Sequence, residues 1–491
     1  MKKVNRRDFA KWTLGSSLML AAPHSRALGA NDAVRVAIVG FRGQGRSHIN
    51  NYRKIPGVRI AALCDVDRDV LNQGLEQFKK RKESADVYTD VRKLLEDPNI
   101  DAVSTATPNH WHALITVWSC QAGKHVCVEK PVSHNIFEGR KMVEAARRYN
   151  RLVQADLDLR SNESVARAVE YVQQGRLGRI LYARIFNYKR RASIGKVDGP
   201  QPIPSSIDFD LWTGPAPMGP LMRKNLHYDW HWVWPTGCGE IGNNGPHQLD
   251  ICRWALGQKQ LPPSVFSLGG RFGYIDDGQT PNTHIAVLDY EPAPIYYESR
   301  GLPRKSGDSL MDNVQIKSVT GKPIPDQHNS KNPNMTWVIQ CEHGYLKYTT
   351  AYDNDGNVIQ QFDGVNPDPQ ASFIKALRSG KPSDLRSDIL EGHLSTSLSH
   401  MGNISYRVGQ EQSSDEIRER IQGDKLLRET YGRFLDHLAA NGVDCRKTPP
   451  TLGAWLTLDS STERFTGDLA EQANLLVSRD YRAPFIVPEK V

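Results

Sequence analysis

The sequence predicts an α/β protein with an N-terminal doubly wound parallel sheet and a C-terminal α+β domain that holds a large, mainly antiparallel open sheet. Three observations lead to this prediction. A β-branched apolar run that starts at Val34 enters a glycine-rich turn and then a helical pattern. A second apolar run, residues 58–64, ends at an acidic residue. Beyond residue 180, strand patterns are separated by glycine, proline and asparagine turns, as in antiparallel sheets.

The composition is that of a globular protein. The 491 residues are 39% hydrophobic and 24% charged, with a formal net charge of +8. The first 30 residues hold +5 of that charge, so the other 461 carry only +3 and contain no long basic run. Nucleic acid is therefore not expected as a partner. The seven cysteines form no C-x-x-C pair, so we expect mostly small buried thiols, with one disulfide left open.

The first 30 residues resemble a twin-arginine export signal. Residues 5–11 read Asn-Arg-Arg-Asp-Phe-Ala-Lys, and the apolar stretch 12–22 that follows is too short to span a membrane as a helix. Small residues at Ala27 and Gly29 fit a cleavage site just before Ala30. We expect the twin-arginine translocase to move the folded protein to the periplasm, with no stable membrane span. An amphipathic N-terminal helix is the alternative interpretation.

The first predicted strand leads into the glycine-rich turn of a dinucleotide-binding Rossmann domain. Gly40 and Gly45 occupy the first and third places of G-x-G-x-x-G, while Arg42 stands at the second. We expect Gly43 to allow the close backbone approach to a pyrophosphate instead, and the Arg42 guanidinium to reach the phosphates. The turn and the helix after it form the phosphate end of the expected site.

The acidic residue after the second strand is Asp65, twenty residues beyond Gly45. A carboxylate at this spacing accepts both hydroxyls of an adenosine ribose and disfavours a 2′-phosphate. The predicted cofactor is therefore NAD rather than NADP. A simple helix N-cap is the alternative role for Asp65.

Two more strand-to-loop units, residues 100–112 and 124–131, end in polar side chains. Helices over 113–122 and 136–149 are expected to supply the right-handed crossovers. Because the carboxyl ends of parallel strands line one crevice, the polar ends should converge on the same cofactor. The further cofactor-binding candidates are Thr107, Pro108, Asn109, His110, His112, Glu129, Lys130 and Asp158.

Three of these motifs carry a family resemblance. Gly-x-Arg-Gly-x-Gly at 40–45, Thr-Pro-Asn-His-x-His at 107–112 and Glu-Lys-Pro at 129–131 resemble the glucose-fructose oxidoreductase, inositol dehydrogenase and rhizopine catabolism (Gfo/Idh/MocA) family. The resemblance implies that Lys130 reaches the nicotinamide ribose and the substrate hydroxyl, and that Glu129 borders the nicotinamide. It also implies a large sheet used for substrate binding and for contacts in a homo-oligomer.

We expect residues 1–30 to be the export signal, 31–160 the NAD-binding domain and 161–491 the substrate domain. A helix over 164–174 and an alternating strand over 180–187 open the substrate domain. A late helix, residues 391–406, contains histidines expected to pack rather than to bind. The later strands are expected over residues 284–290, 295–299, 337–340, 345–350 and 357–362.

Residues 225–235 interleave four aromatic residues with two histidines and an aspartate. Flat rings can cover the C-H face of a pyranose while polar groups bind its hydroxyls, so this segment is a candidate sugar platform. His227, Tyr228 and His231 are the substrate-binding candidates. Aromatic residues that simply fill the core are the alternative.

The family resemblance also implies that His247, after the glycine-rich stretch 237–242, acts with Lys130 on the substrate hydroxyl. Many relatives have aspartate four residues earlier, where this chain has Asn243. An amide can orient a hydroxyl but cannot make the imidazole more basic. A structural histidine at a helix start is the alternative for His247. The histidines show no H-E-x-x-H or carboxylate-linked spacing, so no metal is expected.

The chemistry expected is transfer of a hydride from a secondary carbinol of a sugar to NAD. The periplasm has no comparable pool of free nicotinamide nucleotide. An exported enzyme is therefore expected to keep its NAD tightly bound and to reoxidise it within or between turnovers. The leading hypothesis is an exported NAD-dependent oxidoreductase for a sugar or glycoside. A resemblance to family 109 glycoside hydrolases, in the glycine loop and the leader, implies an alternative, hydrolysis by transient oxidation, elimination and reduction. A non-catalytic sugar-binding scaffold is the third hypothesis, which Asn243 keeps open.

Overall fold

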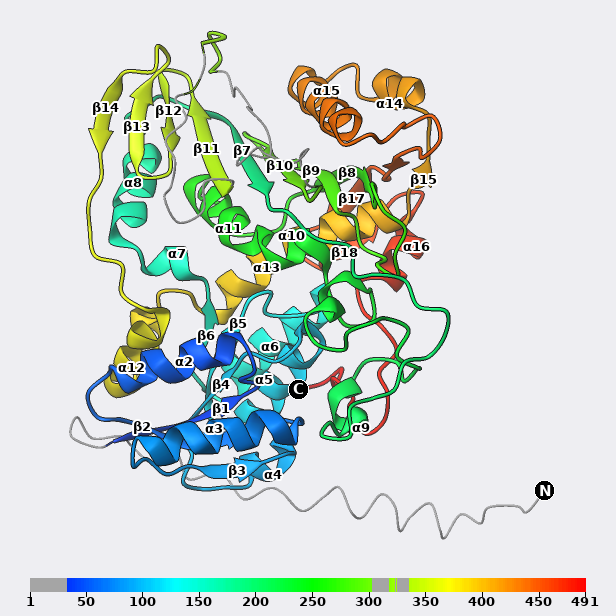
Figure 1. The fold of residues 1–491 in the computed structure, drawn as a ribbon. Coiled ribbons are helices and arrows are strands. Elements are labelled where there is room, and N and C mark those ends of the chain that lie inside the picture. The colour runs from blue at the N-terminus through cyan, green and yellow to red at the C-terminus, as the bar shows by residue number, and fades with distance from the viewer. Residues whose placement is uncertain (1–32, 303–317, 323, 325–334) are drawn as a thin grey trace.

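The computed structural model describes residues 33–302, 318–322, 324 and 335–491 (Figure 1). The predicted export signal, residues 1–30, lies outside the described residues. None of the helices in the described ranges is both long and apolar enough to cross a membrane. All seven cysteines are free thiols, and six of them are buried, so the disulfide left open is not formed in this structure.

Six parallel strands form the N-terminal sheet in the order β3-β2-β1-β4-β5-β6. The order reverses between β1 and β4, which places a crevice at the carboxyl ends of these two strands. The doubly wound parallel sheet is therefore confirmed. Its strands are β1 (Val34–Val39), β2 (Val58–Cys64), β3 (Asp86–Tyr88), β4 (Ala102–Thr105), β5 (His125–Glu129) and β6 (Val153–Asp156).

Helices cover both faces of this sheet. Strand β1 is almost wholly buried, as expected for a central parallel strand. Helix α5 begins at Asn109, whereas the sequence predicted a start at 113. The residues of its first turn are polar, so the sequence pattern indicated a loop, but they are buried and helical in the structure. The helices are α2 (Gln44–Arg53), α3 (Arg68–Lys80), α4 (Val91–Leu95), α5 (Asn109–Gln121) and α6 (Ile136–Arg148).

The C-terminal part contains a 12-stranded sheet that is antiparallel except where β7 pairs with β10. A mainly antiparallel large sheet is thus confirmed. The strands are β7 (Ile180–Tyr188), β8 (Ser264–Gly270), β9 (Thr283–Leu288), β10 (Ile295–Arg300), β11 (Met335–Cys341), β12 (Gly344–Lys347), β13 (Thr350–Asp353), β14 (Val358–Gln361), β15 (Gln410–Glu411), β16 (Thr451–Leu452), β17 (Leu456–Asp459) and β18 (Arg464–Thr466).

The single strand predicted over 345–350 is two strands, β12 and β13, joined by a tight turn. Tyr348 takes a left-handed conformation in this turn, with φ 51°. Glycine or asparagine usually marks such a two-residue hairpin. This turn has neither, so the pattern read as one continuous strand.

Helices pack on both faces of the large sheet, so alternate side chains of one strand lie in different hydrophobic cores. Val265 on β8 packs into the cluster under α11 and α13, whereas its neighbour Phe266 packs against α15. The helices are α7 (Asp158–Ser161), α8 (Glu163–Gln173), α9 (Phe209–Thr213), α10 (Gly239–Asn243), α11 (Gly245–Ala255), α12 (Pro369–Ser379), α13 (Ile389–Arg407), α14 (Ser414–Arg420), α15 (Lys425–Ala440) and α16 (Ala470–Leu475), with 3-10 turns Asp229–Trp232 and Pro382–Asp384.

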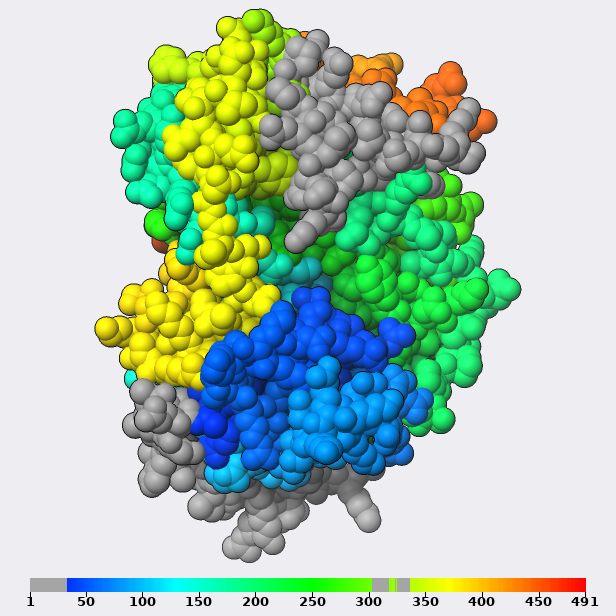
Figure 2. Space-filling model, turned by 60° about the vertical axis from the view of Figure 1, so that its left-hand side comes forward, coloured from blue at the N-terminus to red at the C-terminus, as the bar shows by residue number. Residues whose placement is uncertain are grey.

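Late segments of the chain return to the N-terminal sheet. Phe373 and Leu377 of α12 are buried in one of its cores, and Phe485 near the C-terminus is buried in another. Figure 2 shows the yellow segment that contains α12 directly against the blue N-terminal residues. The division of the chain at residue 160 stays a prediction.

Candidate functional site

A cavity of about 490 Å3 lies at the carboxyl edge of the N-terminal sheet. It is lined from one side by the turns after β1, β2, β4 and β5, and from the other by residues of the C-terminal part. This is where ligands bind in open α/β sheets. The predicted site residues that line it are Gly40, Arg42, Gly43, Asp65, Thr107, Pro108, Asn109, His112, Glu129, Lys130, Asp158, His227, Tyr228, His231, Asn243 and His247.

The glycine loop has the shape that a pyrophosphate requires. Gly40 has φ 75°, and a Cβ there would lie 2.9 Å from the Thr107 main chain. Gly43 precedes α2 and has no atom within 4 Å of an added Cβ, so its main chain is open to a ligand. Arg42 is exposed at the cavity. The N-terminus of the ten-residue α2 therefore faces a position suited to an anion.

Gly45 serves a different purpose from the one predicted. It does not line the cavity, and a Cβ there would lie 2.1 Å from the Gly40 carbonyl oxygen. The residue allows α2 to pack tightly against the turn, which is the usual part of the third glycine of the fingerprint. Its contribution to cofactor binding is through the position of the helix.

Main-chain hydrogen bonds hold the Asp65 carboxylate at the cavity. Its Oδ2 accepts a hydrogen bond from Phe41 N at 3.1 Å, and its Oδ1 accepts from Asp67 N at 3.1 Å. Burial raises the pKa of Asp65 to about 6 despite these hydrogen bonds. The N-cap of α3 is Asp67, whose side chain accepts from Asp69 N. The helix-cap alternative for Asp65 therefore does not hold.

The two histidines of α5 differ in their relation to the cavity. His112 lines it, and its two ring nitrogens lie 2.8 Å from the carbonyl oxygens of Thr107 and Pro131, so a neutral ring can donate to one of them. His110 lies outside the cavity wall, and its Nε2 lies 3.0 Å from Trp212 O. Burial lowers the pKa of His110 to about 3, so the ring is neutral. We therefore assign His110 to packing between α5 and α9 rather than to the cofactor.

Lys130 and His247 line the same cavity from opposite parts of the chain. Lys130 Nζ donates a 2.7 Å hydrogen bond to the main-chain oxygen of Asn243, in the last turn of α10. Carbonyls in the last turn of a helix lack partners within the helix, so they suit an ammonium group. Asn243 thus positions the lysine through its main chain, while its side chain lines the cavity.

His247 lies in the first turn of α11, with a ring nitrogen directed to no protein partner. Among the described residues, its buried Nδ1 has no hydrogen-bonding group. Burial lowers the pKa of His247, and the nearby charge of Asp158 opposes that shift only in part. Because His247 lines the cavity together with Lys130, its neutral imidazole can accept a proton from a bound hydroxyl group.

The aromatic segment contributes to the cavity unevenly. Trp230 and His231 line it as a stacked pair with ring centroids 3.6 Å apart, whereas Trp232 is buried in the core. Tyr228 also lines the cavity, has φ 64°, and accepts a 2.9 Å hydrogen bond from Arg191. The core interpretation therefore holds for Trp232, while a sugar platform at Tyr228, Trp230 and His231 stays a prediction.

His227 lines the cavity near the turn after β2, where its side chain contacts a carboxylate. Its Nε2 is 3.2 Å from Asp67 Oδ2, and Asp67 is two residues beyond Asp65. The chain around it, residues 204–232, crosses from the C-terminal part and lies over the β2 turn; we call it the clasp. Arg68 N donates to Ser206 O at 2.9 Å, and Asp208 N donates to Val66 O at 3.1 Å.

Several residues at the site were missed in the sequence, among them Thr89, Asp90 and Trp111 and the two groups that follow. Leu211 and Trp212 of the clasp line the cavity, but a five-residue helix gives no usable periodicity. His48 and Asp156 bond to each other behind Glu129, and they come from positions 108 residues apart. The polar residues that end β4, β5 and β6 were the available signal for this second group.

Two segments of the chain match models of one oxidoreductase family. Residues 34–157 match its NAD-binding Rossmann fold, and residues 164–270 match its C-terminal alpha/beta domain. The resemblance seen in the sequence motifs is confirmed. The NAD-binding Rossmann fold of the N-terminal part is thereby shown.

Curated relatives and solved structures extend the comparison. A glycosyl hydrolase family 109 protein of Shewanella baltica is 25% identical over 308 residues, which are 62% of this chain and 59% of the relative. An alpha-N-acetylgalactosaminidase of Shewanella oneidensis is 25% identical over 66% of this chain and 65% of its own. The match thus spans about three fifths of the length of these curated relatives.

Among solved structures, the WlbA dehydrogenase of Bordetella pertussis, in complex with NADH and UDP-GlcNAcA, has the same fold. It superposes with a TM-score of 0.55 at 18% identity, over 76% of this chain and 96% of its own.

Proposed function

Residues 34–157 and 164–270 belong to the Gfo/Idh/MocA oxidoreductase family, and from this premise we propose that the protein is an exported NAD-dependent oxidoreductase for a sugar or glycoside. The observation that carries the proposal is the pairing of Lys130 with an unpartnered His247 in one nucleotide-type cavity. We place the mature protein in the periplasm, on the strength of the twin-arginine motif in the sequence.

The donor set fits NAD. The open main chain at Gly43, the N-terminus of α2 and the Asp65 carboxylate supply the pyrophosphate and ribose contacts. When bound, NAD supplies the hydride acceptor. His247 removes the proton of a secondary hydroxyl group, and Lys130, fixed by the Asn243 carbonyl, orients the oxygen of that group. An aspartate is not needed at position 243 for this positioning, because the main chain makes the contact.

The clasp supports tight retention of the cofactor. It contributes Leu211, Trp212 and His227 to the cavity lining. Main-chain hydrogen bonds at Arg68 and Asp208 and the His227–Asp67 pair fasten it to the N-terminal part. A cofactor that leaves the cavity has to displace these contacts, so its release is slow.

A complete glycoside hydrolase is the second candidate, favoured by the names of the curated relatives. Oxidation of a sugar carbinol to a ketone acidifies the adjacent C-H bond, and loss of that proton expels the aglycone. Water then adds, and the hydride returns to the ketone. The sum is hydrolysis with the cofactor unchanged. We propose a carbohydrate partner in either case, and assembly of like chains through the large sheet stays a prediction.

Product analysis separates these candidates from a non-catalytic sugar-binding scaffold. Purified protein is incubated with a panel of free sugars and aryl glycosides of both anomers, with and without a reoxidising dye. Keto-sugar formed only with the dye supports the oxidoreductase. Free aglycone and unoxidised sugar without the dye support the hydrolase. Sugar binding without any product, with NAD added, rejects both enzymatic candidates.

A further inference from the structure

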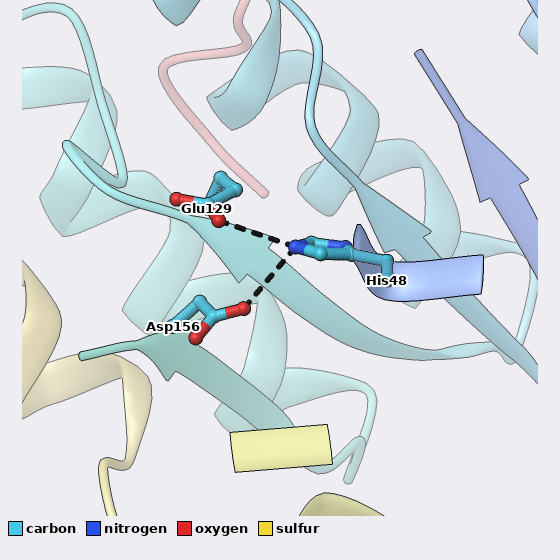
Figure 3. A group of neighbouring side chains, drawn as sticks. All are labelled: His48, Glu129 and Asp156. Atoms are coloured by element: carbon cyan, nitrogen blue, oxygen red, sulfur yellow. Dashed lines mark hydrogen bonds and ion pairs between the residues drawn. The ribbon is translucent and has the colours of Figure 1, made fainter. Parts of the chain in front are cut away.

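Three buried ionisable side chains meet directly behind the strand end that carries Lys130. Figure 3 shows His48 of α2 directed between Glu129, the last residue of β5, and Asp156, the last residue of β6. His48 Nε2 lies 3.2 Å from Glu129 Oε1 and 3.2 Å from Asp156 Oδ2. All three are buried, and of the three Glu129 lines the cavity. We call them the His48 cluster.

Hydrogen bonds around the cluster favour a positively charged ring. Ser104 Oγ lies 2.9 Å from His48 Nδ1 and can accept from it. With Nδ1 engaged there, a proton on Nε2 serves both carboxylates at once. The other donors recorded on the two carboxylates are neutral: Lys130 N to Glu129 at 3.0 Å and Gln370 Nε2 to Asp156 at 2.7 Å.

The electrostatic balance agrees with this arrangement. Burial by itself lowers the pKa of His48, but the hydrogen bonds and charges of Asp156 and Glu129 together raise it to about 10. The pKa of Glu129 is lowered, because its contact with His48 outweighs the effect of burial. Burial and the charge of Glu129 raise the pKa of Asp156 to about 7, and the contact with His48 opposes that rise by favouring the charged carboxylate. A carboxylate without this partner would be a buried, unpaired charge, which is costly.

We propose that His48 is a positioning residue, a buried imidazolium shared by Glu129 and Asp156 that fixes the strand end from which Lys130 reaches the substrate. The link to Lys130 is direct, because the carboxylate that His48 holds also accepts the Lys130 main-chain N-H. The inference rests on the proposed function for its catalytic consequence. Its structural part, one cation shared by two carboxylates, stands on the cluster geometry.

The same three atoms have the spacing of metal ligands, all lying within 4.8 Å of one another. Three features favour the proton. Each carboxylate already accepts from a neutral N-H group, His48 Nδ1 already has a partner in Ser104, and each 3.2 Å contact fits an ordinary N-H···O hydrogen bond. Because the spacing also fits a metal ion, the test includes a measurement of metal content.

The test is a double-mutant cycle of His48→Gln and Asp156→Asn, with His284→Gln as the matched control. His284 is another buried histidine, on β9 of the large sheet, whose pKa burial lowers to about 3. For each protein we measure urea unfolding, bound NAD after purification, metal content, and kcat and KM for the sugar that gives the largest signal. None of the first three readouts requires a known substrate.

His48→Gln leaves two buried carboxylates without a cation, so we expect lower stability and a kcat reduced about 10²-fold with KM little changed. Adding Asp156→Asn removes one of the two charges, so the double variant is more stable and more active than His48→Gln alone. The control keeps wild-type kcat.

Additive or worse losses in the double variant overturn the proposal, as does one equivalent of a divalent metal that His48→Gln loses. If wild-type protein oxidises no sugar, the proposed function fails, while the cycle on unfolding and NAD retention still decides the charge-sharing inference.

Discussion

Two buried histidines contact carboxylates in this protein, and they differ in how their charge is balanced. His48 stands between Glu129 and Asp156, and the described groups bonded to it include no arginine. His393 on α13 lies 2.9 Å from Glu463, but Arg140 on α6 already pairs with the same carboxylate. The pKa of His48 is raised to about 10, whereas the pKa of His393 is lowered by burial and further by Arg140. A buried imidazole becomes a cation where the carboxylates outnumber the other cations.

The two histidines also differ in which part of the molecule they support. The His48 cluster supports the strand end of Lys130, at the edge of the cofactor cavity. The group of His393, Glu463 and Arg140 joins α13, α6 and the β17–β18 turn, outside the cavity lining. We therefore expect changes in the first group to alter turnover, and changes in the second to alter stability alone.

The largest expected effect is at the residue that the first group supports. Lys130→Met should reduce turnover by about 10²- to 10⁴-fold, because the ammonium that orients the substrate oxygen is lost. Bound NAD should remain, since the recorded side-chain partner of Lys130 is the Asn243 carbonyl. Steady-state rates and the NAD content of the purified variant check both statements. Turnover that survives the substitution rejects the mechanism.

A smaller effect, on stability only, is expected at the second group. Glu463→Gln should lower the free energy of unfolding by about 1–3 kcal/mol, because hydrogen bonds to Arg140 and His393 lose their charged acceptor. The cost is limited because Arg140 is partly exposed and can be hydrated. Urea unfolding measures the loss. An accompanying fall in kcat would mean that the two groups are not separate.

The two histidines should respond to pH in opposite directions. The stability that His48 contributes is complete below its unfolded pKa of 6.5 and is lost as pH rises through about 10. His393 has a lowered pKa in the folded state, so it weakens the fold as pH falls below 6.5. Thermal melts of wild type, His48→Gln and His393→Gln across this range provide the measurement. A wild-type advantage over His48→Gln that stays constant above pH 10 contradicts the assignment.

The smallest effect is expected at a third histidine–carboxylate pair, His227–Asp67, which is partly exposed on the histidine side. Exposed pairs of this kind contribute at most about 1 kcal/mol, so His227→Gln should speed NAD release by no more than about 5-fold. Trapping of released cofactor measures the rate, with the exposed His343→Gln as control. If both variants release NAD equally faster than wild type, the clasp does not retain the cofactor.

The sequence predicted those parts of the molecule that depend on local pattern. β-branched runs located the parallel strands, and the spacing from Gly45 placed Asp65 at the cavity, where its ribose-binding role stays a prediction. The motif at the end of β5 placed Lys130 at the cavity, and the family resemblance added His247, which lines the same cavity. Each of these depends on neighbouring residues or on the regular geometry of a parallel sheet.

The partners of several side chains could not be predicted, because they depend on tertiary contacts between segments that are far apart in the sequence. His227 and His110 have side chains suited to ligands, yet the clasp and α9 direct them to Asp67 and to Trp212 O. His48 and Glu129 are 81 residues apart, and no local pattern brings them together. The absence of glycine or asparagine at the Tyr348 turn likewise hid a hairpin.

The central claim is that the protein carries its own hydride acceptor and takes a hydride from a sugar. The most direct test mixes purified protein, with no cofactor added, with each glycoside of the panel and follows the near-ultraviolet absorbance of NADH in a stopped-flow instrument. The account predicts a rise equal to the bound NAD for at least one sugar, and no rise for Lys130→Met. A flat wild-type trace with every sugar, even after NAD is supplied, contradicts the account.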